Sequence, residues 1–306
     1  IMQEINDFNC GFEDWNKIKK NVFRNIRKYN GDLLYKYRAL DLNRSWISAK
    51  DYKISDNFER VIDMLITKKI YVPSLKKVND PFEGRYIEYD VPGWAGKTMH
   101  TMAKKEILVN PFPIKERYVL SLSSSPLVEQ LWAYYCNNYE GVCIVIKNGP
   151  IFNNAKCVNY YKERRNVGMI KQNKFDAFIR ELNRVNIYYK KREWSHEKEI
   201  RIEYNKSELD ENFIKCNDLI VALIIGHNTQ QVVKERLIEV CHANNIETYC
   251  TYLNENDLDI MIVPTDFKYV YDGSPIEKQL ENYYQKNNSI LNYEGKLIEP
   301  VDINND

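Results

Sequence analysis

The sequence lacks any long apolar segment. No run of about 18 apolar residues occurs in its 306 residues, so we expect no membrane-spanning helix and no membrane partner. The opening residues, IMQEINDFNC, contain no apolar core of the kind found in signal peptides. We therefore expect a cytoplasmic protein.

A charge excess is also absent. The chain has 44 Lys and Arg against 43 Asp and Glu, which gives a net charge of +1. Proteins that bind nucleic acid by neutralising phosphates usually carry a basic excess, so this balance does not favour nucleic acid as the main partner. Two local basic stretches, at Lys162–Arg165 and Tyr188–Arg192, leave that class open. We interpret the Lys/Arg residues 189–192 as a solvated helix end.

Cysteine and histidine patterns for metal or disulfide sites are missing as well. The seven cysteines form no Cys-x-x-Cys pair, and the four histidines are scattered. Cys241 and His242 are adjacent, which is too close to make a zinc site alone. We predict reduced, mostly buried thiols and no metal site of this type.

What is present indicates an ordinary globular protein. The hydrophobic fraction of 44% is sufficient for a core, and 23 of the residues are Tyr. Helical spacing of apolar residues alternates with short strand-like runs, which predicts one mixed α+β domain with a mixed central sheet and helical additions at both ends. We place an N-terminal helical extension at residues 1–30, the main domain at 31–265 and a C-terminal helix and loop at 266–306. Expected helices within this scheme cover residues 13–30, 55–69, 126–141 and 173–194.

Three polar segments follow or precede predicted strands. They are Tyr35–Arg38, Ser121–Ser125 and the Glu-Lys-Glu sequence at 197–199. An arginine fork suits phosphate or carboxylate, and serine hydroxyls can orient neighbouring groups. Two carboxylates two residues apart on a strand would face the same way, where one could stabilise a developing cation and the other orient a nucleophile. This set suits chemistry on a phosphate-bearing ligand whose sugar passes through an oxocarbenium ion.

The order Arg, Ser, Glu resembles the ADP-ribosyltransferase superfamily, whose members cleave NAD at the nicotinamide–ribose bond. The matching pieces are Tyr37-Arg38, Ser121-Leu122-Ser123 (or Ser123-Ser124-Ser125), and Glu197-Lys198-Glu199 before an apolar strand. The resemblance implies a split central sheet, with NAD as substrate, no bound cofactor and a macromolecule or water as acceptor. It would make Arg38 a ligand for NAD phosphate or ribose, and a serine the support for the catalytic loop. Glu199 would be the catalytic carboxylate on the ribose hydroxyl, and Glu197 the residue that positions the acceptor.

The chain resembles more closely a bacterial and phage family of uncharacterised function. The shared run is LYKYR…NDPFEG…SLS…WAxY…GVCI…WSxEKExR, and it covers roughly residues 30 to 230. Here its pieces are 34–38, 79–84, 121–123, 132–135, 141–144 and 194–201. This likeness implies a role in phage–host conflict or toxin-type biology.

Other interpretations of the same residues stay open. Asp80 and Glu83 could line the same cleft, or one of them could pair with Arg38. Trp132 and Tyr135 could stack on a flat ring such as nicotinamide, or pack in the core. Arg201 could bind substrate or fix Glu199 in a salt bridge.

Two other functions compete with the transferase. The first is a metal-dependent nuclease or phosphodiesterase, with oxygen ligands from Asp80, Glu83, Glu197 and Glu199. The second is a regulatory module that binds a nucleotide without turning it over.

Overall fold

The structure is a computed structural model that describes residues 26–41, 56–75, 87–90, 117–162, 165–169, 187–255 and 257–298. For 87–90 and 165–169 it describes the backbone alone. The predictions on Asp80, Glu83 and most of the helices at 13–30 and 173–194 lie outside these residues. The end of the helix predicted at 13–30 is wrong, because residues 26–30 are not helical and Lys28 forms an isolated β-bridge with Lys156.

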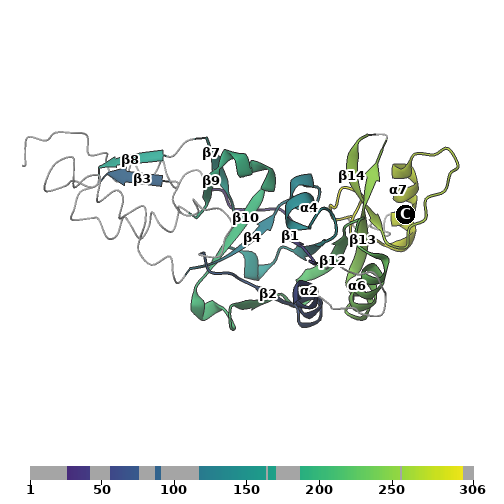
Figure 1. The fold of residues 1–306 in the computed structure, drawn as a ribbon, viewed down its shortest axis with the longest axis horizontal. Helices are drawn as coiled ribbons and strands as arrows, with labels where there is room; N and C mark the ends of the chain where they lie inside the picture. The colour runs from purple at the N-terminus through teal and green to yellow at the C-terminus, as the bar shows by residue number, and fades with distance from the viewer. Residues whose placement is uncertain are drawn as a thin grey trace, which may run out of the picture.

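An eight-stranded mixed sheet forms the centre of the described chain (Figure 1). Only the β12–β13 pair is parallel within it, and α6 connects these two strands. This arrangement confirms the predicted α+β class. Across the sheet the strands are β14 (Asp259–Pro264), β13 (Glu247–Asn254), β12 (Ile220–Ile225), β5 (Val142–Lys147), β1 (Leu33–Arg38), β4 (Tyr118–Ser123), β10 (Glu199–Tyr204) and β6 (Lys156–Cys157).

Three two-stranded sheets and four α-helices complete the described elements. The small sheets pair β11 (Phe213–Lys215) with β2 (Lys69–Tyr71), β3 (Ile87–Asp90) with β8 (Arg165–Met169), and β7 (Asn159–Tyr161) with β9 (Tyr189–Lys191). The helices are α2 (Asp56–Thr67), α4 (Glu129–Tyr135), α6 (Gln231–Ala243) and α7 (Ile276–Asn287). No helix in this part of the chain is long and apolar enough to cross a bilayer.

Helices pack on both faces of the sheet because its strands are apolar on both sides. One face, with Leu34 and Ile144, packs against α2 and α6. The other face, with Tyr35 and Val145, packs against Trp132 of α4. The C-terminal segment joins the same core: α7 packs on β14, and the Tyr35 hydroxyl donates to the Gly295 carbonyl at 2.5 Å.

The central sheet is weakly joined at one point. Strand β1 is paired with β5 over six residues, and β4 is paired with β10 over six. Between β1 and β4, by contrast, the register contains the single pair Tyr35 and Ser123. The two strands therefore diverge beyond this pair, toward Arg38 on β1 and Ser121 on β4, and side chains of both strands line one pocket.

The long helix predicted over 173–194 is wrong at its C-terminal end. Tyr189–Lys191 form β9 and Arg192–Glu197 form a 3₁₀ helix. Pairing of β9 with β7, about 30 residues earlier in the chain, overrides the local helical pattern. The helix predicted over 126–141 ends early, since Asn137, Asn138 and Tyr139 have positive φ.

Candidate functional site

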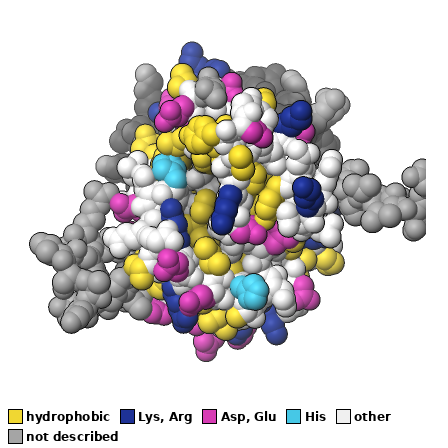
Figure 2. Space-filling model, turned by 90° about the vertical axis from the view of Figure 1, so that its right-hand side faces the viewer, with side chains coloured by type: hydrophobic (Ala, Val, Ile, Leu, Met, Phe, Trp, Pro, Cys, Tyr) yellow, Lys and Arg dark blue, Asp and Glu magenta, His cyan; other side chains and the backbone are white. Residues whose placement is uncertain are grey.

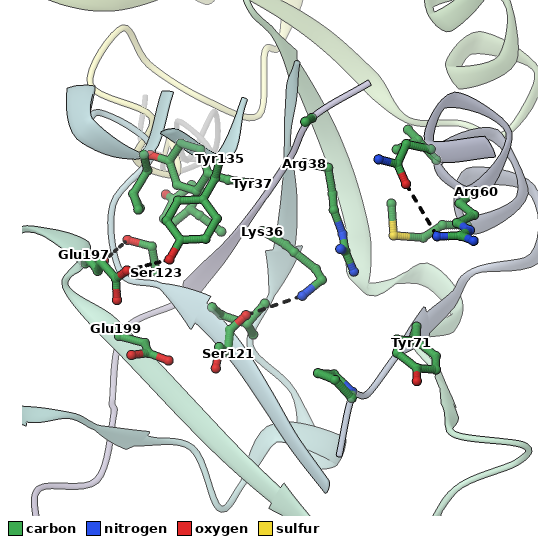
Figure 3. A pocket seen from close by; sticks show the side chains of 18 of the residues that line it. Lys36, Tyr37, Arg38, Arg60, Tyr71, Ser121, Ser123, Tyr135, Glu197 and Glu199 are labelled. Carbon is green, nitrogen blue, oxygen red and sulfur yellow. Dashed lines mark hydrogen bonds between the residues drawn. The ribbon is translucent and has the colours of Figure 1, made fainter. Parts of the chain in front are cut away.

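A pocket of about 920 Å³ lies where β1 and β4 diverge (Figure 3). Its wall comes from β1, β4, α2, α4, β2 and the start of β10. Glu197 and Glu199 lie at one end, Arg38 and Arg60 lie at the other, and Lys36 and Ser121 lie between. The pocket thus brings together Arg38, the serines and the Glu-Lys-Glu segment, which the sequence separates by up to 161 positions, from Arg38 to Glu199.

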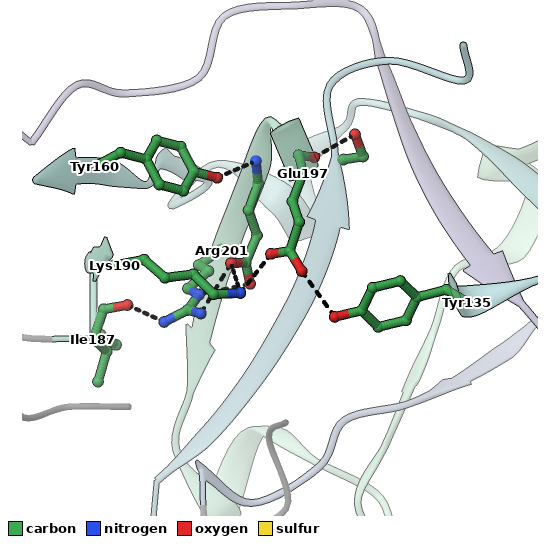
Figure 4. Close-up of polar contacts among 8 residues, drawn as sticks. Tyr135, Tyr160, Ile187, Lys190, Glu197 and Arg201 are labelled. Atoms are coloured by element: carbon green, nitrogen blue, oxygen red, sulfur yellow. Dashed lines mark hydrogen bonds and ion pairs between the residues drawn. The ribbon is translucent and has the colours of Figure 1, made fainter. Parts of the chain in front are cut away.

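Glu199 is held by a bidentate ion pair within its own strand. Arg201 donates from Nε to Glu199 Oε1 at 2.7 Å and from Nη2 to Oε2 at 2.9 Å. The guanidinium is also fixed by a hydrogen bond from Nη1 to the carbonyl of Ile187 (Figure 4). Arg201 is 1% exposed and Glu199 6% exposed, so this pair belongs to the interior of the protein. Of the two interpretations of Arg201, substrate binding or a salt bridge to Glu199, its contacts support the salt bridge.

Lys190 lies between the two acids of the Glu-Lys-Glu segment. Its Nζ donates to Glu197 Oε2, and to Glu199 Oε2 at 3.1 Å, and it lies 4.8 Å from the ring centroid of Trp194. The interpretation of 189–192 as a solvated helix end is therefore wrong for Lys190, which is 6% exposed. Sequence reasoning missed this residue because its contacts depend on the pairing of β9 with β7.

Glu197 is positioned by a backbone turn rather than by a strand. It ends the 3₁₀ helix, and Lys198 follows with a left-handed φ of +46°. The expectation that both glutamates lie on one strand is wrong for Glu197, although both carboxylates line the pocket and contact Lys190. The Ser123 hydroxyl donates to the Glu197 carbonyl at 2.8 Å, and the Ser124 amide donates to the Lys198 carbonyl at 3.0 Å. The serine cluster thus supports the segment that carries the acids.

Opposing effects set the charge of this cluster. Burial alone would raise the pKa of Glu199, but the neighbouring cations Arg201 and Lys190 outweigh it and lower that pKa to about 2. Burial likewise lowers the pKa of Lys190, while Glu199 and Glu197 raise it, and the net direction is upward. Glu199 and Lys190 are therefore both charged near neutral pH, and the cluster pairs two carboxylates with two basic side chains.

The two carboxylates differ in how many acceptor sites remain. A carboxylate accepts about four hydrogen bonds. Glu199 receives two from Arg201, one from Lys190 and one from the Ser121 side chain, so its capacity is filled. Glu197 receives one from Lys190 and one from the Tyr135 hydroxyl at 2.8 Å. Within the described residues, Glu197 is the acid with acceptor sites left for a ligand.

The opposite end of the pocket is basic. Lys36 is 8% exposed, and its Nζ lies 3.4 Å from the Ser121 carbonyl oxygen. Burial lowers the pKa of Lys36 well below its usual value, and Arg38 lowers it further. The pKa of Arg38 is also lowered, first by burial and then by the charge of Arg60. Arg60 belongs to the basic end although no sequence pattern pointed to it, and Lys36, from the polar segment Tyr35–Arg38, lies between this end and Ser121.

The aromatic residues selected from the sequence have different places. Tyr35, Tyr37 and Tyr135 line the pocket, but Trp132 does not. The Tyr37 hydroxyl donates to the Ser125 carbonyl at 2.9 Å. The Tyr37 ring packs edge-on against Trp132, with 5.3 Å between the two ring centroids. Trp132 is fully buried, with its indole N–H on the Pro126 carbonyl at 2.8 Å. Trp132 thus supports the pocket wall from within the core.

A glycine keeps the wall closed behind Arg38. A Cβ at Gly141 would lie 2.3 Å from the Arg38 carbonyl oxygen and 2.8 Å from the Cα of Cys136. Only glycine allows this close backbone approach. The chain can therefore pass from α4 into β5 directly against the end of β1.

Comparison with known proteins gives a family of unknown function. A family model described as a protein of unknown function (DUF2971) matches residues 131–202. The matched region runs from α4 to β10 and includes Tyr135, Lys190, Glu197, Glu199 and Arg201. No curated protein and no solved structure shows a significant match to the chain. The chain is thus similar to an uncharacterised family over the segment that supplies the acidic end of the pocket.

Proposed function

We propose that this pocket binds NAD and cleaves its nicotinamide–ribose bond, with ADP-ribose passing to a macromolecule or to water. The observation that carries the proposal is the shared pocket, in which Arg38 and Glu197 lie at opposite ends with Ser121 between them. The basic end suits the diphosphate of a dinucleotide, and the acidic end suits the ribose and its cationic nicotinamide. The divergence of β1 and β4 supports the proposal, since the resemblance to ADP-ribosyltransferases implies a split sheet.

The reaction needs a stabilised cation rather than a strong acid. When the bond between C1′ and the nicotinamide nitrogen breaks, its electron pair neutralises the pyridinium and leaves an oxocarbenium ion on the ribose. A nucleophile from water or the acceptor then attacks C1′ and loses a proton. A nearby carboxylate can stabilise the developing positive charge and orient a ribose hydroxyl or receive that proton.

Contacts favour Glu197 for this role over Glu199. Glu199 has its acceptor sites filled by Arg201, Lys190 and Ser121, and its low pKa makes it a poor proton acceptor at neutral pH. Glu197 has two acceptor sites left and is aimed by Tyr135 and Lys190. In this proposal Glu197 contacts the substrate, and Glu199 positions the two cations beside it.

Incubation of the purified chain with labelled NAD, with and without a cell extract, tests the proposal. We expect release of nicotinamide, or a labelled macromolecule, from the wild type, and a loss of about 100-fold or more in the Glu197→Gln variant. Glu203→Gln is the matched control, because Glu203 lies on β10, the strand that follows Glu197, and pairs with Arg117 at 3.3 Å outside the pocket. Absence of nicotinamide release and of labelled product in the wild type would defeat the proposal.

One observation favours a nucleotide-binding module without turnover as the second candidate. Both acids are neutralised by buried cations, which is also how a purely structural ion-pair network is built. This candidate predicts tight NAD or ADP-ribose binding that survives the Glu197→Gln change and is accompanied by no nicotinamide release.

The metal-dependent nuclease has less support in the described residues. No group of three His, Cys, Asp or Glu side chains there could hold a metal ion, while Asp80 and Glu83 lie outside that part of the chain. Cleavage of RNA or DNA that depends on added Mg²⁺ or Mn²⁺ would promote this function over NAD cleavage.

A further inference from the structure

We propose that Lys36, Arg38 and Arg60 together form a subsite for a diphosphate group. This inference deepens the proposed function, on which it rests for the identity of the whole ligand as a dinucleotide. The subsite joins two residues of β1 to one residue of α2 across the basic end of the pocket.

Unbalanced charge is the first observation. Six basic side chains line the described pocket wall, against the three acids Asp63, Glu197 and Glu199. Lys190 and Arg201 are balanced by the two glutamates, and Lys69 is balanced by Asp210 at 2.8 Å on the surface. The remaining basic residues are Lys36, Arg38 and Arg60, and no salt bridge to any of them occurs among the described residues.

Burial is the second observation. A lysine ammonium that is 8% exposed has lost most of its hydration, and the carbonyl of Ser121 at 3.4 Å replaces little of it. Arg38 is half-buried beside it. Burial is the largest cause of the lowered pKa values of Lys36 and Arg38, and repulsion from a neighbouring arginine, Arg38 for Lys36 and Arg60 for Arg38, lowers both further. An anion placed between these side chains would remove the repulsion and supply the missing hydrogen-bond acceptors.

Geometry gives the third observation. Figure 3 shows Arg38 on β1 and Arg60 on α2 at the same end of the pocket, where Arg60 also donates from Nη1 to Asn57 Oδ1 at 3.5 Å, and Lys36 points from β1 toward Ser121. Two forks and one point charge suit the several oxygens of a diphosphate, because guanidinium groups bind phosphate in pairs of parallel hydrogen bonds. A diphosphate here would place the attached sugar on the side of Ser121 and the glutamates.

Isothermal titration calorimetry with inorganic pyrophosphate, ADP and adenosine tests the subsite without any turnover. We expect the full chain to bind pyrophosphate and ADP, and to bind adenosine at least tenfold more weakly than ADP. Lys36→Met and Arg60→Gln should each weaken pyrophosphate binding by about tenfold or more, the loss expected for one charged hydrogen bond. Lys147→Met is the matched control, since Lys147 is exposed on the neighbouring strand β5 and does not line the pocket.

The outcomes separate this inference from the proposed function. Wild-type binding of pyrophosphate that all three variants retain unchanged would overturn the subsite, and so would the absence of any pyrophosphate binding. Binding that is weakened by Lys36→Met and Arg60→Gln, in a protein that never releases nicotinamide from NAD, would support the subsite and reject the cleavage. Arg60 is exposed on α2, so its replacement tests the subsite even if Lys36→Met fails to fold.

Discussion

Arg201 neutralises Glu199 from two residues further along the same strand, with both side chains on one face of β10. The two nitrogens of the guanidinium that contact the carboxylate lie 2.7 and 2.9 Å from its two oxygens. Residues two apart on a strand face the same side of the sheet, so this ion pair forms within one strand. The charge of Glu199 is therefore neutralised by a residue of its own strand, and Lys190 of β9 neutralises Glu197.

The first prediction concerns the stability that depends on Arg201. Replacement by Met leaves Glu199 buried with less compensation, and breaking a buried pair in this way costs about 3–5 kcal/mol of unfolding free energy. Arg236→Met is the matched control, because Arg236 pairs with Glu239 at 3.1 Å with both side chains more than half exposed and should change stability by less than about 1 kcal/mol. Urea unfolding of the three proteins measures both effects. Equal stability of the two variants would contradict the interpretation of the pair.

The second prediction is a dependence of stability on pH. Glu199 has a pKa of about 2 in the folded protein against a usual value of 4.5, so it binds its proton more readily when unfolded. The stability from this group is present above pH 4.5 and is lost as the pH falls toward 2. The difference between 4.5 and about 2 corresponds to about 3 kcal/mol.

Comparison with Glu199→Gln isolates that contribution from the other acids. Glutamine cannot ionise, so the variant should be less stable than the wild type at pH 7, and the gap should narrow between pH 4.5 and pH 2. Unfolding free energies measured across this range provide the test. A gap that stays constant with pH would show that Glu199 is not held ionised by its neighbours.

A third prediction distinguishes two roles for Tyr135, the positioning of Glu197 and the binding of substrate. Tyr135→Phe removes the hydroxyl that donates to Glu197 Oε1 at 2.8 Å, and the loss of one hydrogen bond to a charged group costs about 1.5–3 kcal/mol at most. If Glu197 acts on the ribose, kcat for NAD cleavage should fall severalfold while KM changes little. Tyr271→Phe, at a side chain 94% exposed, serves as the control and should behave as the wild type. A rise in KM alone would instead assign Tyr135 to substrate binding.

The fourth prediction tests the serine support of the acidic segment. Ser123→Ala removes the hydroxyl that donates to the Glu197 carbonyl, so amide hydrogen exchange of residues 197–199 should accelerate. Ser124→Ala should have a smaller effect, because the Ser124 backbone amide still donates to the Lys198 carbonyl. Mass spectrometry of peptic fragments can measure both. The reverse order of the two variants would contradict the assigned roles.

Sequence patterns predicted the strands of the site more successfully than they predicted which charged residues line it. The strand beginning at Glu199 and the position of Arg38 at a strand end were predicted, because alternation of apolar residues is a local signal. Lys190 was missed since it sits in the Tyr-Tyr-Lys-Lys-Arg run, which is typical of an exposed helix end. Its burial follows from the pairing of β9 with β7, and such long-range contacts leave no periodic trace.

The sequence also does not predict that Glu197 keeps hydrogen-bond acceptor sites for a ligand while those of Glu199 are filled. The Glu-Lys-Glu spacing suggests equivalent acids on one face, and the left-handed Lys198 that separates them is not a position where lysine is expected. Arg60 was hidden for another reason: on α2 it reads as one more polar residue of an amphipathic helix. Its contribution depends on how α2 packs against the sheet, which the sequence alone does not specify.

On the face shown in Figure 2, the described acidic and basic side chains are interspersed, whereas the pocket has a charge-balanced end, where Glu197 and Glu199 meet Lys190 and Arg201, and an end with Arg38 and Arg60. This difference gives the cavity a polarity. A molecule that is negative at one tip and neutral or positive at the other is expected to bind with its negative tip at the end that holds Arg38 and Arg60. Charge alone would then select the orientation of an asymmetric guest before any contact with its individual atoms is made.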